Sequence, residues 1–527
     1  MPFDPVELSI FNSLFSSVAE EMGVALGRTA YSPNIKERRD YSCAVFDPLG
    51  RMVSQAAHIP VHLGAMPHAV RVALERFIFQ PGDLVIFNDP YLGGTHLPDI
   101  TMVSPVFEKN EAESALLGYL VSRAHHADVG GISAGSMPLA TELYQEGIII
   151  PPIKVLQAGE PNRAVLDLIY RNVRTPQERK GDLTAQIAAH RIGELRLQEI
   201  ASRYGAAKII DGMNELMEYS ERLTRRAINS IPQGVYRFQD QLDDDGIGPE
   251  PIPIVLEITV SDEGMSFDFT GSAPEQQGSV NAVLAVTESA VYYTVQCLLG
   301  EGTPINDGCY RPVTVIAPER SVVNPAPPRA VSAGNVETSQ RIVDVVLGAL
   351  AQAIPDRIPA ASQGTMNNIT IGGWDPVRER LFAYYETIAG GIGAGPSGEG
   401  LSATHSHMTN TMNTPVEVLE YTYPFMVREY AVRRGSGGDG LHKGGDGITR
   451  AIEFLAPATV TVISDRHYTS PYGLLGGGSG NKGQSTLITA GAKIQELPPK
   501  TTISTQRGDI IELLTPGGGG WGQPPSP

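Results

Sequence analysis

Residue types suited to holding a metal ion occur together in two segments, near residues 96 and 125. His96 and Asp99 stand three residues apart, and His125 follows His96 by 29 residues, with His126 directly after it. An imidazole and a carboxylate three apart on a loop can point at one ion, and a histidine at the end of a neighbouring strand can supply a third ligand. Mixed nitrogen and oxygen ligation suits Zn²⁺, Mn²⁺ or Fe²⁺ and leaves positions open for water or substrate. Spacing alone leaves a second interpretation open, in which these histidines bond to buried loop backbone.

Small and acidic residues nearby bear on the same candidate site. Gly93, Gly94, Gly130 and Gly131 flank the two segments, and glycine permits close approach of backbone to a ligand. Asp40, preceded by two arginines, is a candidate fourth ligand. A solvated run of charge explains the same residues, so the spacing leaves the role of Asp40 open.

Two other groups of histidines are weaker candidates: His58, His62 and His68, and His405 with His407. His58 and His62 are four apart, but Pro60 between them argues against a regular helix. We expect the first group to line a cleft or cap loops. The second group lies in a segment rich in Ser, Thr and Asn and is a candidate for orienting a substrate.

No segment matches a nucleotide-binding loop in its full context. Residues Gly393 to Gly398 fit the pattern GxGxxG, but Pro396 lies inside it and the residues after it do not begin a helix, which a dinucleotide site requires. The glycine run from 476 to 483 lacks GxxxxGK[ST], and no GxSxG nucleophile motif occurs. The sequence therefore predicts no ATP site in this chain.

The elements expected to position these residues alternate between helices and short strands. Apolar residues at spacings of three and four predict a helix from Glu7 to Ala30, with Ile10 and Phe11 among its inward residues. A second helix is expected over residues 65–77. Strands are expected over residues 42–46, 83–87, 102–107 and 115–121.

The middle and end of the chain differ in pattern. Residues 182–231 predict two long helices broken at Tyr204-Gly205, followed by strands at 236–239 and 255–260 and a helix at 337–354. We predict an α+β or mixed α/β fold with several lobes, many short strands, ordered Gly/Pro-rich loops and a long helical segment in the middle. The expected regions are 1–160 with the metal site, 161–232, which is helical, and 233–527, which is rich in strands. These regions could also form one intertwined unit.

Composition narrows the class of protein. The 527 residues carry a net charge of −18, which disfavours a dedicated binder of nucleic acid or of anionic membranes. No apolar run reaches the roughly 18 residues that a membrane helix needs, and the N-terminus has no signal-peptide pattern. The three cysteines are too few for a disulfide framework. We expect a cytoplasmic protein.

Five motifs, in order along the chain, resemble the hydantoinase B / 5-oxoprolinase family. They are NIKERRDYSCA at 34–44, NDPYLGGTHLPD at 88–99, RAHHADVGG at 123–131, HMTNTMNTPVE at 407–417 and PGGGGWG at 516–522. The likeness covers essentially the whole chain. Extra residues at 108–111 predict only a surface hairpin extension.

The resemblance implies a function and a partner. Proteins of this family are B-type subunits of ATP-dependent hydrolases of cyclic amides such as 5-oxoproline, hydantoins and caprolactam. ATP and Mg²⁺ bind to a separate A-type subunit, which phosphorylates the lactam oxygen, so a hetero-oligomer is expected. The B-type subunit completes ring opening with a metal centre, whose ion lowers the pKa of its water.

The resemblance also assigns residues and leaves alternatives. It implies that Asp40, His96, Asp99 and His125 are the metal ligands, with His125 less certain than the others because His126 is adjacent. His126 and Asp128 are then candidates for orienting ligands or transferring protons, or for a purely structural role. The alternative functions are a subunit of an ATP-dependent ketone carboxylase of the acetone or acetophenone type, and a scaffold subunit without catalysis.

Overall fold

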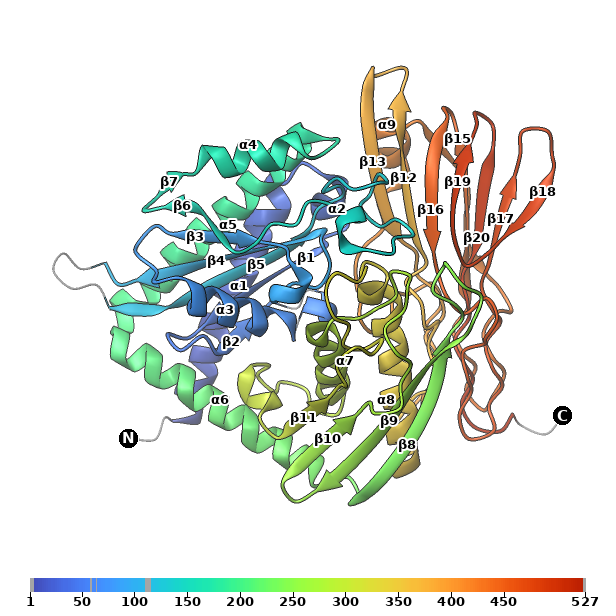
Figure 1. The fold of residues 1–527 in the computed structure, drawn as a ribbon. Coiled ribbons are helices and arrows are strands. Elements are labelled where there is room, and N and C mark those ends of the chain that lie inside the picture. The colour runs from blue at the N-terminus through green and yellow to red at the C-terminus, as the bar shows by residue number, and fades with distance from the viewer. Residues whose placement is uncertain (1–3, 57–58, 63, 110–114, 525–527) are drawn as a thin grey trace.

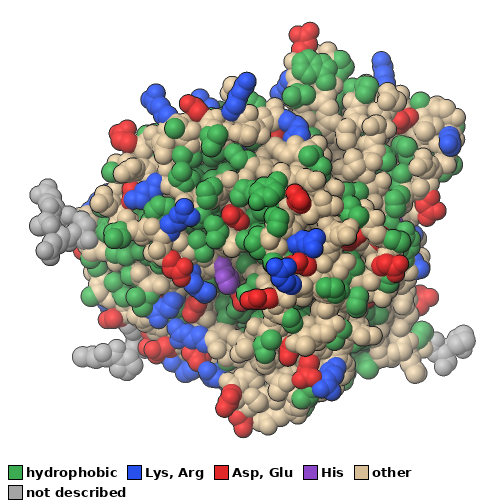
Figure 2. Space-filling model, in the orientation of Figure 1, with side chains coloured by type: hydrophobic (Ala, Val, Ile, Leu, Met, Phe, Trp, Pro, Cys, Tyr) green, Lys and Arg blue, Asp and Glu red, His purple; other side chains and the backbone are tan. Residues whose placement is uncertain are grey.

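The computed structural model describes residues 4–56, 59–62, 64–109 and 115–524. Within them the chain forms four β-sheets and a set of helices in several lobes, which confirms the predicted mixed α/β class (Figure 1). In this view the N-terminal and C-terminal lobes lie on opposite sides of helices α7 and α8. His58 and residues 110–111 of the expected hairpin extension lie outside the described residues. On the face drawn in Figure 2, acidic and basic side chains are interspersed.

The first sheet carries the predicted site. It has seven strands in the order β2-β1-β5-β4-β3-β6-β7, and every pairing in it is antiparallel. Four strands were expected from the sequence and are confirmed, although β4 begins three residues earlier than expected. The strands are β1 (Tyr41–Phe46), β2 (Met52–Gln55), β3 (Leu84–Phe87), β4 (Asp99–Phe107), β5 (Leu116–His125), β6 (Ile153–Gln157) and β7 (Glu160–Pro161).

Three long helices support this sheet: α1 (Pro5–Thr29), α5 (Pro176–Tyr204) and α6 (Ala206–Ile228). The predicted break between the last two is confirmed, because Gly205 has φ +85°, a conformation that glycine adopts at little cost. Phe11 and Phe15 of α1 are fully buried in a core shared with α5 and α6. The expectation for Ile10 was wrong, since its side chain is 44% exposed. The buried stripe of α1 runs through the neighbouring residue Phe11 instead.

Short helices complete this part of the chain: α2 (Pro33–Lys36), α3 (Ala65–Arg76) and α4 (Arg163–Arg171), with single turns η1 (Pro60–His62), η2 (Pro90–Leu92) and η3 (Leu143–Gln145). The helix expected at 65–77 is therefore confirmed as α3. Helix α4 lies in the region 161–232 that was expected to be helical, although no individual helix was predicted at these residues.

The second lobe packs one helix, α8, on a four-stranded sheet of order β11-β10-β9-β8, in which only the β10–β11 pairing is parallel, and a second helix, α7, packs against α8. Its elements are β8 (Gly234–Leu242), β9 (Ile252–Ser261), β10 (Gly264–Asp268), β11 (Val313–Ile316), α7 (Leu284–Cys297), η4 (Asp307–Tyr310) and α8 (Ser339–Ala353). The helix predicted at 337–354 is confirmed as α8. A π-helical turn, η5 (Gly334–Thr338), precedes it and was not expected.

The C-terminal lobe is a pair of sheets packed face to face around one apolar core. Their orders are β13-β12-β16-β19 and β14-β15-β20-β17-β18. The elements are β12 (Asn368–Asp375), β13 (Arg380–Thr387), α9 (Val416–Thr422), β14 (Phe425–Arg433), β15 (Gly447–Phe454), β16 (Ala458–Ile463), β17 (Gln484–Ile488), β18 (Ile494–Leu497), β19 (Lys500–Thr505) and β20 (Ile510–Leu514). Glycine is required beside this lobe: a Cβ on Gly518 would lie 2.2 Å from the Ile392 carbonyl oxygen.

The largest apolar core joins segments from all parts of the chain. It includes Ile86 from the first sheet, Leu183 from α5 and Ile342 from α8. The domain boundaries at 160 and 232 stay a prediction. In the described part of the chain, no helix combines the length and the apolar character needed to cross a membrane.

Candidate metal centre

The first sheet brings the predicted metal-ligating residues together. Asp99 is the first residue of β4, and His125 is the last residue of the adjacent strand β5. The two are directly paired in the antiparallel register, so their side chains share one face of the sheet. His96 lies on the loop just before β4. The chain thus places two candidate ligands by strand pairing and the third by the short connection into β4.

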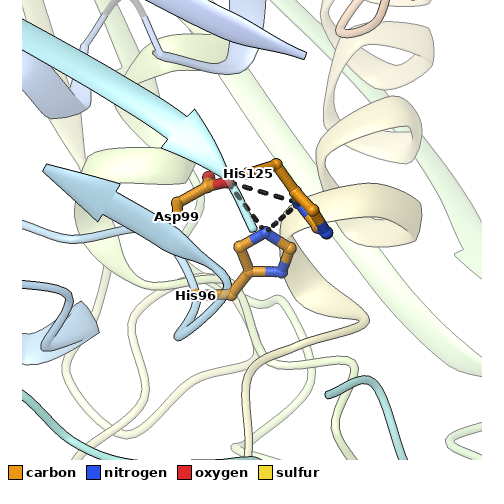
Figure 3. A group of neighbouring side chains, drawn as sticks. All are labelled: His96, Asp99 and His125. Atoms are coloured by element: carbon orange, nitrogen blue, oxygen red, sulfur yellow. Dashed lines mark hydrogen bonds and ion pairs between the residues drawn. The ribbon is translucent and has the colours of Figure 1, made fainter. Parts of the chain in front are cut away.

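Three side-chain atoms converge at this edge (Figure 3). His96 Nε2 lies 3.2 Å from His125 Nδ1 and 3.2 Å from Asp99 Oδ1. His125 Nδ1 lies 3.3 Å from the same oxygen of Asp99. Ligand atoms about 2.1 Å from one ion are about 3.4 Å apart in a tetrahedral arrangement. The triangle in this structure therefore has nearly the dimensions of three ligands of a single ion.

The protonation of this triangle favours a bound cation. His96 Nδ1 faces the Ser332 carbonyl oxygen at 3.3 Å, so a proton on Nδ1 leaves Nε2 as a lone-pair donor aimed at the other two atoms. Asp99 Oδ1 is buried and accepts no hydrogen bond. The three side chains are at most 2% exposed. Buried acceptor atoms that face one another are costly unless a cation lies between them, and a divalent metal fits this donor set.

Burial and charge act against each other on these groups. Burial alone would raise the pKa of Asp99, but the neighbouring His96 and His62 lower it well below its ordinary range. Burial lowers the pKa of His96, and the Asp99 carboxylate outweighs this and raises it. At His125 burial dominates and the pKa is lowered. The carboxylate thus stays ionised and supplies the negative charge of the site.

Neighbouring polar groups fix the orientation of these three side chains. His62 Nε2 lies 3.3 Å from Asp99 Oδ2, and the other ring nitrogen of His62 lies 2.7 Å from Ser42 Oγ. Ser332, whose carbonyl oxygen faces His96, donates its own backbone N–H to Glu146 at 2.9 Å. Such partners around metal-ligating histidines raise ligand basicity and hold the ring orientation.

The convergent atoms border a small cavity of about 20 Å³, which is room for about one water molecule. Its wall includes Asp40, His62, Asn335, Tyr385 and Thr409 as well as Asp99 and His125. Among the described residues, the group whose ligand atoms all lie within 4.8 Å of one another is His96, Asp99 and His125. Asp40 is outside that group, although its carbonyl oxygen accepts the His125 N–H at 3.0 Å. Ligation by Asp40 stays a prediction.

The structure separates His125 from its neighbour. His126 is buried on the other side of the strand end, where its Nε2 lies 2.9 Å from Gln186 Oε1 of α5. Burial, with a contribution from Arg179, lowers the pKa of His126 to about 4. Asp128 accepts the backbone N–H and a guanidinium N–H of Arg174, both at 2.8 Å. These contacts tie His126 and Asp128 to the helical segment, and their roles stay a prediction.

The remaining candidate histidines take other positions. His68 forms an ion-pair contact with Glu288 at 2.5 Å. His407 is buried, with Nδ1 3.5 Å from Tyr293 Oη and Nε2 3.9 Å from Asp344 Oδ1. Neither belongs to the convergent group. A substrate-orienting role for His405 and His407 stays a prediction.

Two residues at the centre were not found from the sequence. Asn335, in the π-helical turn, places Nδ2 3.2 Å from His96 Nε2, and its Oδ1 has no hydrogen-bond partner. The Tyr385 ring stacks on His125 with centroids 4.5 Å apart. Each lies more than 200 residues along the chain from its partner, so no local spacing could have indicated it. A π-helical turn itself often marks a functional position.

Residues 4–524 match the protein-family description Hydantoinase B/oxoprolinase. The chain belongs to this family. The match spans nearly the whole sequence and confirms the resemblance drawn from the five motifs.

Relatives within the Hydantoinase B/oxoprolinase family differ in length. The chain is 41% identical to 5-oxoprolinase 1 of Arabidopsis thaliana over 98% of its own residues but 42% of that protein. It is 32% identical to a putative B-type subunit of a D-/L-hydantoinase, from Pseudomonas sp. (strain NS671), over 99% of its residues and 90% of that relative. The chain thus spans about two fifths of the 5-oxoprolinase and nearly all of the hydantoinase subunit.

Solved structures share the fold. The ATP-dependent caprolactamase from Pseudomonas jessenii superposes with a TM-score of 0.91 at 27% identity, over 99% of this chain and 91% of that chain. Acetone carboxylase superposes with a TM-score of 0.90 at 19% identity, over 98% of this chain and 76% of the other. The second likeness concerns the fold alone.

Proposed function

We propose that this chain is the metal-bearing subunit of an ATP-dependent enzyme that opens a cyclic amide after a partner subunit has phosphorylated it. The observation that carries the proposal is the buried convergence of His96, Asp99 and His125 at one edge of the first sheet. The activities for which two similar proteins are named, 5-oxoprolinase and ATP-dependent caprolactamase, support the substrate class.

Phosphorylation belongs to a partner in this proposal. The segment Gly393 to Gly398 forms a turn closed by an isolated bridge between Gly395 and Gly398, and no helix begins within the 15 described residues after it. A dinucleotide or phosphate loop needs a helix N-terminus at that point. ATP and Mg²⁺ are therefore assigned to an A-type subunit, and the likeness to one subunit of a hydantoinase supports an assembly of several subunits.

The residues of this chain would carry out the step after phosphorylation, which is the opening of the activated ring. An amide resists hydrolysis because of its resonance, and phosphorylation of its oxygen creates an imidate-like electrophile with a good leaving group. His96, Asp99 and His125 would hold a Zn²⁺, Mn²⁺ or Fe²⁺ ion, with Asp40 as a proposed fourth ligand. Such an ion lowers the pKa of a water molecule and polarises a substrate oxygen.

The other side chains position these groups. His62 and Ser332 hold Asp99 and the His96 ring in the orientation that directs their donor atoms to one point. The apolar side chains of Val61, Val336 and Met366 in the cavity wall limit the water that reaches it. Addition of one water to the activated carbon and cleavage of the ring C–N bond would give an acyl phosphate and a free amine, and a second water would release inorganic phosphate and leave a linear amino acid or a carbamoyl product.

The test is reconstitution with a protein that resembles an A-type subunit and is encoded beside this chain. We expect ATP-dependent opening of 5-oxoproline, a hydantoin or caprolactam by the pair, and neither tight ATP binding nor lactam hydrolysis by this chain alone. Removal of metal with a chelator should stop ring opening. Robust lactam opening by the isolated chain, or full activity without metal, would contradict the proposal.

A second candidate, a ketone carboxylase subunit, is favoured by the shared fold with acetone carboxylase. Labelled bicarbonate separates the two functions, because only the carboxylase incorporates the label into its product. Metal analysis distinguishes a catalytic subunit from a scaffold subunit. Protein purified without chelators should contain no transition metal if it is only a scaffold.

A further inference from the structure

A wide groove lies on the outer side of the first sheet, next to the metal cavity. Its volume is about 660 Å³, within the range of about 300–1,000 Å³ typical of small-molecule sites. Residues from four separate segments line it, among them Glu20, Arg28, Lys36, Arg39, Tyr41 and Met412. The metal cavity holds only about 20 Å³, so a cyclic amide that carries a phosphoryl group needs additional space of this kind.

The groove is positively charged although the chain is acidic. Three of its lining side chains are cationic and exposed, namely Arg28, Lys36 and Arg39, while Glu20 is its one acidic lining residue. None of the three cations forms an ion pair with any residue in the described part of the chain, in contrast to Arg196 of α5, which pairs with Glu21 at 2.6 Å. In a chain with a net charge of −18, three unpaired cations around one hollow make a local site for an anion.

The groove and the metal cavity share a wall. Asp40 lines the cavity, and the next residue, Tyr41, lines the groove. In the same way, Thr409 lines the cavity and Asn410 lines the groove. Arg39 has φ +56°, a left-handed conformation that is rare outside glycine. This turn leaves Arg39 exposed to the groove while Asp40 is 7% exposed in the cavity wall. One backbone turn therefore presents a cation outward and a carboxylate inward.

The types of the lining residues indicate which anion fits. Guanidinium groups offer planar, paired N–H donors that match phosphate oxygens, and a lysine adds a point charge. The apolar side chains of Val24 and Met412, beside the cations, offer contact for a carbon ring. A small ring that carries a phosphoryl group has both features.

We propose that the Arg28/Lys36/Arg39 groove binds the phosphoryl group of the activated cyclic amide before the ring reaches the metal cavity. The identity of this ligand rests on the proposed function, but the capacity of the groove to bind phosphate does not. Three exposed cations give an interaction that weakens as salt is added.

Inorganic phosphate is the probe, measured by equilibrium dialysis at low ionic strength. The variant is the triple replacement Arg28→Gln, Lys36→Gln and Arg39→Gln. The matched control replaces three exposed cations outside the groove, Arg226→Gln, Lys493→Gln and Arg507→Gln, which changes the net charge equally. Both sets are repeated in a His96→Ala background, so that phosphate bound at the metal is excluded.

We expect the groove variant to lose at least about tenfold in phosphate affinity and the control to retain it, in both backgrounds. In the reconstituted enzyme, the groove variant should release phosphate from ATP while ring opening falls. Phosphate affinity equal to that of the wild type in the groove variant overturns the proposal, and so does displacement of phosphate by acetate at equal concentration, which would indicate a carboxylate site. If the reconstituted wild type opens no lactam, the proposed function fails, and the dialysis still decides the groove.

Discussion

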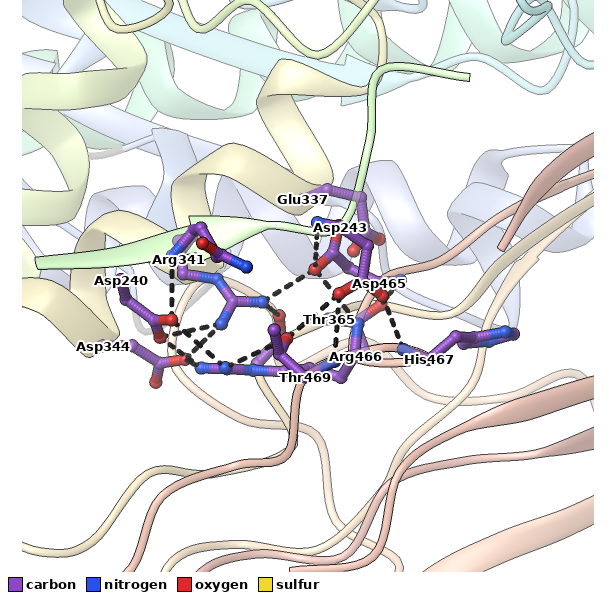
Figure 4. A network of polar contacts seen from close by, with 12 residues as sticks. Asp240, Asp243, Glu337, Arg341, Asp344, Thr365, Asp465, Arg466, His467 and Thr469 are labelled. Carbon is purple, nitrogen blue, oxygen red and sulfur yellow. Dashed lines mark hydrogen bonds and ion pairs between the residues drawn. The ribbon is translucent and has the colours of Figure 1, made fainter. Parts of the chain in front are cut away.

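Two clusters of buried ionisable residues occupy different parts of the molecule and differ in how their charges are matched. One is the metal triad, defined as His96, Asp99 and His125. The other is the charge network, defined as Asp240, Arg341, Asp344, Asp465 and Arg466, which links β8, α8 and the loop after β16 (Figure 4). Members of both clusters have little or no exposure to solvent.

The charge network pairs each of its carboxylates with at least one cation. Asp465 accepts from Arg341 at 2.9 Å and from Lys500 at 3.0 Å. Arg466 Nη2 lies 2.7 Å from Asp240 and 2.7 Å from Asp344. These pairs join residues up to 226 positions apart, so the network connects the second lobe to the C-terminal lobe. Its role is to hold lobes together.

The metal triad lacks such a cation. Asp99 Oδ1 meets two imidazole nitrogens that also face each other, and at most one proton can lie between each pair. A bound metal ion would supply the charge that arginine and lysine supply in the network. Burial of charge alone therefore does not mark a functional site, whereas buried donor atoms that have no cation among them do. Variants in the two clusters should therefore fail in different ways.

The largest effect is expected from His96→Ala in the metal triad. Loss of one neutral nitrogen ligand should lower metal affinity by more than about 100-fold, beyond what the loss of an outer hydrogen-bond partner causes. Ring opening should stop, while uncoupled ATP hydrolysis by the partner survives. Metal analysis, phosphate release and ring opening are measured side by side.

His126→Ala is the control for this variant, because His126 Nε2 contacts Gln186 rather than the triad. It should keep its metal. Full metal content and full ring opening in His96→Ala would refute the catalytic interpretation. If His126→Ala lost its metal and His125→Ala did not, the metal site would stand, but its third ligand would be His126 in place of His125.

Arg341→Met in the charge network should have the opposite signature. Removal of this fully buried cation leaves Asp240 and Asp465 short of a partner, a change that typically costs about 3–5 kcal/mol. The midpoint of thermal unfolding should fall clearly, while metal content per folded molecule stays that of the wild type. An unchanged midpoint would mean that the network does not hold the lobes together.

Metal binding itself should stabilise the protein through the triad. A ligand at 100 times its dissociation constant adds about 2.7 kcal/mol to the free energy of unfolding. Chelator-treated protein should therefore unfold at a lower temperature and recover when Zn²⁺, Mn²⁺ or Fe²⁺ is restored. The recovery should persist in Arg341→Met and vanish in His96→Ala. Recovery in both variants would place the stabilising ion elsewhere.

A carboxyl group beside the charge network predicts a pH dependence. Burial, reinforced by Asp465, raises the pKa of Glu337 to about 8, above its ordinary 4.5. A raised pKa means that the folded state holds a proton which the unfolded state releases, so this stabilisation is complete below about pH 4.5 and is lost as pH rises towards 8. Glu337→Gln should flatten the fall in unfolding midpoint between pH 5 and 8. An identical slope in both proteins would contradict the assignment.

The sequence revealed the parts of this molecule that depend on local pattern. His96, Asp99 and His125 were found because loop spacing and two adjacent strands determine their meeting, and the break at Gly205 follows from one residue type. Helix α7 was missed, since its β-branched and aromatic residues are typical of strands, and packing against α8, η1 and α3 stabilises them as a helix.

Contacts between distant segments could not be read from one sequence. Arg466 meets Asp240 across 226 positions, and neither residue stands in a recognisable motif. Ligation by Asp40 stays a prediction that rests on its motif, since the convergent group among the described residues consists of His96, Asp99 and His125. Register and loop course decide such contacts, and they depend on the whole fold.

The smallest effect concerns Asn335, whose amide lies 3.2 Å from His96 Nε2 in the cavity wall. Gln340 is its natural control: it lies five residues further along the same helical segment, is equally buried, and donates to the Ser406 carbonyl oxygen at 2.9 Å, away from the triad. Because Asn335 acts through His96, Asn335→Ala should lower metal affinity by about tenfold, the lower end of the cost of losing an outer partner. Gln340→Ala should leave metal affinity unchanged. Competition with a metallochromic chelator measures both. Equal metal affinities in the two variants would show that Asn335 only fills the π-helical turn. The amide oxygen of Asn335 has no hydrogen-bond partner in this structure. A loss of affinity as large as that of His96→Ala would therefore make this oxygen a direct ligand of the ion.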